Sequence, residues 1–123
     1  MYTLRVEGEF SSSHQLRGYE GKCENLHGHN WRVEMYVRGE KLNNIGLLID
    51  FKLLRKVLNE ILKKLDHTFI NELKPFDEIN PSAENIAKYI FDKAEKSLEN
   101  ELAEVYKIAV FETQKSMAVY SKC

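Results

Sequence analysis

Two long stretches of the chain alternate apolar with polar side chains, and this period of two limits the possible folds more than any other feature. The residues of one parity in the first stretch, residues 2–14, include Leu4, Val6, Phe10 and His14. The corresponding residues of the second stretch, residues 29–38, are His29, Trp31, Val33, Met35 and Val37. Such alternation is typical of strands with one buried face. We therefore expect two half-buried strands, separated by a polar, glycine-bearing loop over residues 17–26.

The middle of the chain changes to the spacing of helices. Asp50 is placed to cap a first helix, whose apolar residues recur at spacings of three and four: Phe51, Leu54, Leu58, Ile61 and Leu65. We expect this helix to end at Asp66 and His67. Asn80 as a cap and Pro81 as the first helical residue predict a second helix, with its apolar face at Ile86, Ile90, Ala94 and Leu98. Alternation returns in residues 104–113 and 116–121, which predict two closing strands.

The predicted order of elements is ββααββ over residues 1–123, which we interpret as one domain. An α+β fold fits this order: a four-stranded antiparallel sheet with two helices on one face. The net charge of −1 provides no basic surface for a phosphate backbone, which argues against a nucleic-acid partner. No apolar run approaches the ~20 residues of a membrane span, and the first residues lack the apolar stretch of a signal peptide. We therefore expect a cytoplasmic protein that does not bind membranes.

Three of the four histidines gather around the two predicted strands. His27 and His29 are two positions apart, so in a regular strand their side chains project to the same side. Gly28 between them has no Cβ and lets the backbone bend toward a metal. His14 ends the first strand, and pairing of the strands can bring it alongside. Imidazole suits zinc, and three protein ligands leave the fourth position of a catalytic site open, so the cluster predicts a zinc enzyme.

Two other interpretations of this cluster stay open. The histidines can be unrelated side chains of a loop and a strand, since a lone His-x-His pattern has little specificity. Cys23, four residues before His27, can instead be a fourth ligand that closes a structural zinc site. A closed site would leave Asp66 and His67 without a role.

Candidate proton-transfer groups form a second set. The fourth histidine, His67, directly follows Asp66. A turn at the end of the helix can let the carboxylate orient the imidazole, although a histidine that only caps the helix is an alternative. Cys23, expected as a reduced thiol, can act as a base only as a thiolate, which a nearby zinc would favour. Glu112 shares the parity of apolar residues in its strand, and there it needs a partner: a guanidine-like ligand or a neighbouring Lys or Arg.

Six short motifs, taken together, give the chain a family resemblance. They are Phe10-Ser11-Ser12-Ser13-His14, Cys23-Glu24-Asn25-Leu26-His27-Gly28-His29, Gly46-Leu47-Leu48-Ile49-Asp50-Phe51, Leu65-Asp66-His67, Pro81-Ser82-Ala83-Glu84-Asn85-Ile86-Ala87 and Phe111-Glu112-Thr113. In this order they resemble the 6-pyruvoyl-tetrahydropterin synthase family, and within it the 6-carboxy-tetrahydropterin synthases of queuosine biosynthesis. The resemblance covers nearly the whole chain.

This resemblance implies a fold and an assembly. The implied fold is the tunnelling fold, whose subunits join their sheets into a barrel, and the implied assembly is a homohexamer, a dimer of trimers. An assembly of this kind would satisfy the open edges of a lone four-stranded sheet. In the same comparison His14, His27 and His29 match the zinc ligands of the family.

The resemblance also assigns the remaining site residues. Cys23, Asp66 and His67 match the catalytic triad of the family, with the last two lent by an adjacent subunit. Glu112 matches the acid that anchors the guanidine-like edge of the pterin ring. The implied reaction is that of a zinc-dependent lyase, which converts 7,8-dihydroneopterin triphosphate to 6-carboxy-5,6,7,8-tetrahydropterin, acetaldehyde and triphosphate.

Glu24, which follows Cys23, leaves the branch of the family open. In a folate-pathway branch a glutamate replaces the cysteine, and the same substrate is cleaved to 6-hydroxymethyl-7,8-dihydropterin. A surface side chain without a role is the other interpretation of Glu24. Activity as a 6-pyruvoyl-tetrahydropterin synthase and a pterin- or zinc-binding protein without catalysis are further alternatives.

Overall fold

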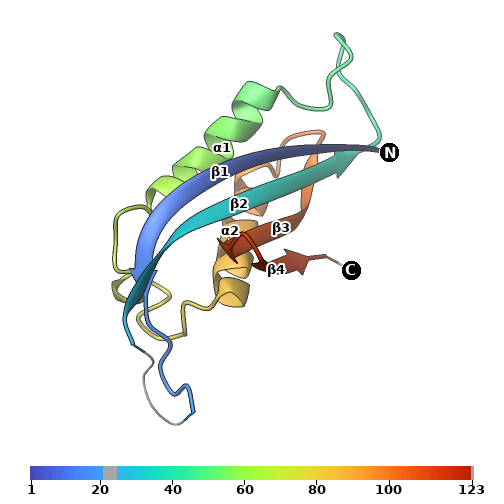
Figure 1. Ribbon diagram of the computed structural model, residues 1–123. Coiled ribbons are helices and arrows are strands. Elements are labelled where there is room, and N and C mark those ends of the chain that lie inside the picture. Colours follow the sequence, from blue (N-terminus) through green and yellow to red (C-terminus); the bar gives the residue numbers. More distant parts are fainter. Residues whose placement is uncertain (21–24, 123) are drawn as a thin grey trace.

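The computed structural model describes residues 1–20 and 25–122. The elements follow one another as β1 (Tyr2–His14), β2 (His27–Gly39), α1 (Phe51–Lys63), the 3₁₀ helix η1 (Ile70–Glu72), α2 (Ala83–Ser97), β3 (Glu104–Thr113) and β4 (Ser116–Ser121). The strands form one antiparallel sheet in the order β1-β2-β3-β4, and both helices lie on one of its faces (Figure 1). The predicted α+β fold is therefore confirmed. Among the described residues, no helix combines the length and apolar character needed to cross a membrane.

The pairing of β1 with β2 explains why alternation predicted their buried face. Phe10 pairs with Trp31, and both side chains are buried beneath the helices. Their rings stack with centroids 5.6 Å apart. Burial of a large apolar side chain of this kind contributes roughly 1.5–3 kcal/mol. The same register brings His14 opposite His27 at the end of the two strands.

Helix α1 packs closely against β1. Its N-terminus is capped as predicted, because the Asp50 carboxylate accepts a hydrogen bond of 2.8 Å from the backbone N–H of Lys52. A Cβ added to Gly8 of β1 would lie 2.8 Å from Cδ1 of Leu62, so the glycine lets the helix approach the strand. The buried stripe of the helix consists of Leu54, Leu58, Ile61 and Leu62.

Helix α2 begins two residues later than predicted, at Ala83 instead of Pro81. Ser82 caps it, because its hydroxyl accepts a hydrogen bond of 3.1 Å from the backbone N–H of Asn85. The Asn80 side chain instead bonds both backbone groups of Arg17, far away in the sequence. The prediction failed because Asn80-Pro81 also satisfies the local rules for a helix start, and the partner that engages Asn80 is not local.

Helix α1 ends earlier than predicted, at Lys63, so Asp66 and His67 lie in the turn beyond it. The apolar spacing misled the prediction, because Leu65 is buried although it is no longer helical. After Leu65 the backbone turns to the free edge of β1, where the N–H of His67 donates to the carbonyl of Ser11 at 2.6 Å. His67 itself has a φ of 53°, in the left-handed region that a sharp turn requires.

Two irregularities interrupt the pairing of β3 with its neighbours. The first lies between Tyr36 and Val37 of β2, which pair with Lys107 and Val105, so Tyr106 is an extra residue of β3 at this point. Its ring contacts that of Tyr36. The second lies between Phe111 and Thr113, which leaves Glu112 outside the regular pairing with β4. Glu112 keeps the parity of Val110, which pairs with Val33 of β2, so its side chain lies on the same face of the sheet as Trp31 and His29.

Candidate metal centre and active site

The three predicted metal ligands converge at one end of the sheet. β1 supplies His14, and β2 supplies His27 and His29. The Nε2 atoms of His14 and His27 are 3.1 Å apart. The centroids of the three imidazole rings lie 4.7, 5.2 and 4.6 Å from one another. His14 is buried, whereas 36% of the His27 side chain is exposed, so the cluster opens to solvent on the side of His27.

Backbone carbonyls orient two of these imidazoles. Nδ1 of His14 lies 2.8 Å from the carbonyl oxygen of Pro81, and Nδ1 of His27 lies 2.8 Å from that of Asn25. A carbonyl can only accept, so each Nδ1 carries the proton and each Nε2 directs its lone pair into the cluster. This arrangement of an imidazole is the usual one at a metal site. No sequence pattern indicated the role of Pro81, because its contact is made through the backbone.

A fourth ligand atom reaches the same place from β3. Oε1 of Glu112 lies 2.9 Å from Nε2 of His29 and 3.8 Å from the Nε2 atoms of both His14 and His27. All four ligand atoms lie within 4.8 Å of one another. The sequence predicted Glu112 as a carboxylate that needs a partner, but did not predict that it faces the histidines.

The four residues fit a metal ion in both type and spacing. A tetrahedral ion with bonds of about 2.0–2.1 Å, as for zinc, holds its ligand atoms about 3.3–3.4 Å apart. The four separations given above, at 2.9, 3.1, 3.8 and 3.8 Å, lie on both sides of that value. Three imidazoles and one carboxylate can therefore hold a metal ion here with only small movements.

An aromatic wall closes the inner side of the cluster. Trp31 is fully buried, and its ring centroid lies 4.8 Å from that of His14 and 5.2 Å from that of His29. Its indole N–H donates to the carbonyl of Ser12 at 3.3 Å, which fixes the ring. A wall that excludes water strengthens electrostatic attraction between an ion and its ligands.

Asp66 and His67 form a hydrogen-bonded pair on the outer edge of β1. Oδ2 of Asp66 lies 2.8 Å from Nδ1 of His67, and Oδ1 accepts a hydrogen bond of 2.8 Å from the backbone N–H of Ser11. The bond from Ser11, assisted by His67, lowers the pKa of Asp66 although desolvation opposes it. The carboxylate is thus anionic at neutral pH and holds the Nδ1 proton, which leaves Nε2 to exchange one. The His67 side chain is 83% exposed.

Two asparagines, neither of them predicted to contact this part of the chain, hold the segment that follows His14. The Asn71 side chain accepts from the N–H of Gln15 at 2.9 Å and donates to its carbonyl at 2.7 Å. Asn80 makes the same two bonds with Arg17, each of 2.8 Å. Each amide therefore replaces a neighbouring strand at the end of β1. Their partners lie 56 and 63 residues away in the sequence, so no local pattern could have revealed them.

Two predicted site residues, Cys23 and Glu24, lie outside the described part of the chain. Arg17, a cationic side chain near the cluster, donates through its guanidinium to the carbonyls of Phe76 and Ile79. The guanidinium of Arg17 thus anchors the connection before α2.

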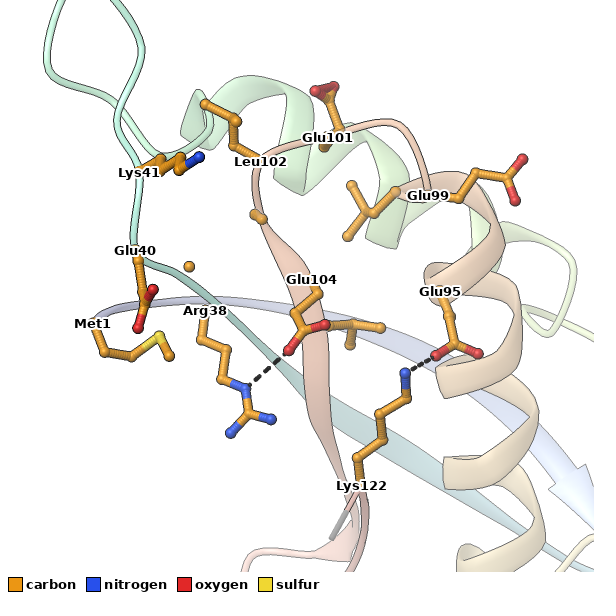
Figure 2. Close-up of a pocket in the computed structure, with 14 residues that line it drawn as sticks. Met1, Arg38, Glu40, Lys41, Glu95, Glu99, Glu101, Leu102, Glu104 and Lys122 are labelled. Atoms are coloured by element: carbon orange, nitrogen blue, oxygen red, sulfur yellow. Dashed lines mark hydrogen bonds and ion pairs between the residues drawn. The ribbon is translucent and has the colours of Figure 1, made fainter.

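A hollow of about 660 Å³ lies at the opposite end of the sheet, between Met1 and the end of α2 (Figure 2). Its charged side chains include two ion pairs, Arg38 with Glu104 at 3.2 Å and Lys122 with Glu95. Exposed pairs of this kind contribute little energy. Among the described residues, its lining contains neither histidine nor cysteine. We therefore assign the candidate chemistry to the histidine end of the sheet.

Comparison with known proteins agrees with this geometry. The family described as 6-pyruvoyl tetrahydropterin synthase matches residues 3–123. The chain belongs to this family. The resemblance predicted from the six motifs is thereby confirmed, and the match extends over nearly all of the chain.

Proteins similar to this chain carry different names. The chain is 34% identical to a 6-carboxy-5,6,7,8-tetrahydropterin synthase of Synechocystis sp., over 98% of this chain and 93% of that relative. It is 33% identical to the 6-pyruvoyl tetrahydrobiopterin synthase of Homo sapiens, over 94% of this chain and 81% of that relative. A solved structure of the Caenorhabditis elegans 6-pyruvoyl tetrahydropterin synthase matches the fold with a TM-score of 0.86 at 27% identity, covering 99% of this chain and 96% of that one.

Proposed function

We propose that this chain is a zinc-dependent lyase that converts 7,8-dihydroneopterin triphosphate and one water molecule to 6-carboxy-5,6,7,8-tetrahydropterin, acetaldehyde and triphosphate in queuosine biosynthesis. The observation that carries the proposal is the convergence of three histidines and Glu112 in a member of the 6-pyruvoyl tetrahydropterin synthase family. The 34% identity to the Synechocystis enzyme over 98% of the chain supports this branch.

The metal would be held by His14, His27 and His29, whose Nε2 atoms share one small volume. Zinc bound there would act as a Lewis acid, which polarises the substrate hydroxyls and makes protons beside them easier to remove. The chain itself contributes the orientation of these ligands, through the Pro81 and Asn25 carbonyls. The buried indole of Trp31 keeps water from the inner side.

Glu112 would bind the pterin ring. A carboxylate can accept two parallel hydrogen bonds from the guanidine-like edge of a pterin, as it does from arginine. A hollow of about 420 Å³ lies beside Glu112, between the start of α2 and β4. This volume is within the range that small-molecule sites occupy, about 300–1,000 Å³. A ring bound there would lie beside the carboxylate that also contacts the histidines.

His67 and Cys23 would move the protons. Asp66 holds the Nδ1 proton of His67, so Nε2 is the atom that accepts a proton from the substrate or returns one. The negative charge of Asp66 stabilises the imidazolium that forms. Cys23 would take the other proton as a thiolate, a form that nearby positive charge favours.

We also propose that His67 serves the metal centre of a neighbouring subunit in a homohexamer. Its exposure on the outer edge of β1 supports this, since Glu112 lies two strands away on β3. Subunit mixing tests it. His67→Ala and His29→Ala variants, each inactive alone, should regain activity when refolded together, with about a quarter of the sites complete if the subunits mix at random. No recovery in mixed oligomers would contradict a shared site.

Product identification tests the reaction itself. Purified protein with zinc and 7,8-dihydroneopterin triphosphate should yield acetaldehyde and a carboxypterin. A hydroxymethylpterin would instead establish the folate-pathway alternative. If Cys23→Ala leaves turnover intact while Glu24→Ala abolishes it, the assignment to the queuosine branch is wrong. Binding of metal and pterin without any product would identify a binding protein.

A second activity has direct support from one comparison. The 33% identity to the human 6-pyruvoyl tetrahydrobiopterin synthase makes 6-pyruvoyl-tetrahydropterin the alternative product. The same incubation distinguishes it, because that product forms without release of acetaldehyde. A cytoplasmic location remains part of the proposal, and fractionation of cells that express the chain would test it.

A further inference from the structure

We infer that Glu112 is an exchangeable metal ligand, which occupies the fourth coordination position in the substrate-free enzyme and leaves it when the pterin ring binds. The inference rests on the proposed function, because it requires a metal at the three histidines and a pterin at Glu112. It adds a link between the two: recognition of the ring would open the metal to the side chain of the substrate.

The geometry of Glu112 favours a metal ligand over a simple hydrogen-bond partner. A hydrogen bond to His29 alone would explain the 2.9 Å between Oε1 and Nε2. It would not explain why the same oxygen lies 3.8 Å from both other Nε2 atoms, at equal distances. An oxygen in the fourth corner of a tetrahedron faces all three nitrogens in this way.

The position of Glu112 in β3 also suits a ligand that can leave. It lies at the irregularity between Phe111 and Thr113, where pairing with β4 is interrupted. About a third of its side chain is exposed, whereas His14 is buried. The hollow assigned to the pterin ring is lined by Glu112 as well. One carboxylate thus borders both the metal centre and the ring site.

These two contacts compete for the same carboxylate. Oriented toward the histidines, it neutralises part of the charge of a divalent ion and leaves no open position. Oriented toward the guanidine-like edge of a pterin, it makes two charge-assisted hydrogen bonds and no longer fills that position. A catalytic metal needs a position for its substrate, so departure of Glu112 would prepare the site only when the correct ring is present.

Cobalt(II) in place of zinc provides a direct readout, because its visible absorption reports the ligands of the ion. We expect the substrate-free wild type and Glu112→Gln to differ in this spectrum, and the variant to bind cobalt at least about tenfold more weakly in a chelator competition. The matched control is Glu104→Gln, which removes a carboxylate at the other end of β3 and should leave both measurements unchanged. Glu112→Asp, a shorter carboxylate, is a second variant should Glu112→Gln fold poorly, and should also change the spectrum.

The bare pterin ring, without a substituent at C6, tests the exchange in the unmodified protein. It cannot supply hydroxyls to the metal, yet its binding should shift the wild-type cobalt spectrum toward that of Glu112→Gln. A ring that binds, as judged by its own fluorescence, and leaves the spectrum unchanged would overturn the exchange. Identical spectra and affinities for wild type, Glu112→Gln and Glu112→Asp would overturn the inference but leave the proposed function intact. Cobalt uptake unaffected by His29→Ala would overturn both.

Discussion

Replacement of Asp66 by asparagine should lower kcat of the proposed reaction by roughly 10²–10⁴-fold, the contribution that a positioned general acid or base makes. The carboxylate has two partners, the N–H of Ser11 and Nδ1 of His67, each at 2.8 Å. Asparagine has only one carbonyl oxygen. If that oxygen keeps the bond from Ser11, the amide NH₂ faces His67 and donates to a bare Nδ1. The proton of the neutral imidazole then moves to Nε2, and the outward nitrogen can no longer accept one.

Steady-state kinetics across a range of pH would measure the effect. We expect the loss in kcat with little change in KM, because Asp66 acts through His67 rather than on the substrate. Nitrogen NMR of His67 should show the Nδ1–H tautomer in the wild type and the Nε2–H tautomer in Asp66→Asn. The control is Asp92→Asn, which removes an exposed carboxylate paired with Lys88 on α2. A kcat for Asp66→Asn equal to that of the control, or a change confined to KM, would refute the reasoning.

Three further predictions concern stability. Burial favours the neutral form of Glu34, but hydrogen bonds from Arg5, Tyr36 and Arg32 outweigh it and lower the pKa of this carboxyl. The contribution of the Glu34 carboxylate to folding stability is therefore present above the unfolded-state pKa near 4.5 and is lost as the pH falls through the lower folded-state value. In urea unfolding, the stability advantage of wild type over Glu34→Gln should shrink on acidification, and a constant difference would count against this. Gly39→Ala should cost about 1–3 kcal/mol in chemical denaturation, because its Cβ would lie 2.8 Å from the backbone oxygen of Leu102, and unchanged stability would contradict the close approach. Zinc at 100 times its Kd should raise the free energy of unfolding by about 2.7 kcal/mol, which corresponds to roughly 10 °C in the melting temperature of a 123-residue chain. A chelator should reverse this shift, and the His14→Ala variant should not show it.

The parts of the fold that could be predicted are those whose signal is local. The alternation in residues 2–14 and 29–38 gave the buried faces of β1 and β2, because each side chain there faces either the helices or the opposite side. The bounds of β3 and β4 followed from the same pattern. Helix ends were less accurate, since contacts made far along the chain influence them. Helix α1 stops at Lys63, before the turn in which the backbone of His67 bonds β1, and Asn80 bonds Arg17 rather than capping α2.

In the candidate site, too, some contacts follow from local sequence patterns and others depend on residues far away in the sequence. Convergence of His14, His27 and His29 follows from parity and strand pairing, both readable in the sequence. The hydrogen bond between Asp66 and His67 also followed from their adjacency at a turn. The contact of Glu112 with the histidines did not, because it depends on the register between β2 and β3, which no local pattern reveals. The Pro81 carbonyl that orients His14 leaves no trace in the pattern of side chains.

The most direct test of the central claim is X-ray absorption spectroscopy of the protein loaded with one equivalent of zinc, together with anomalous diffraction at the zinc edge. We predict a single zinc ion between His14, His27 and His29, with three nitrogens at about 2.0–2.1 Å and an oxygen in the fourth position. A zinc ion bound elsewhere, or a sulfur atom among its ligands, would contradict the account.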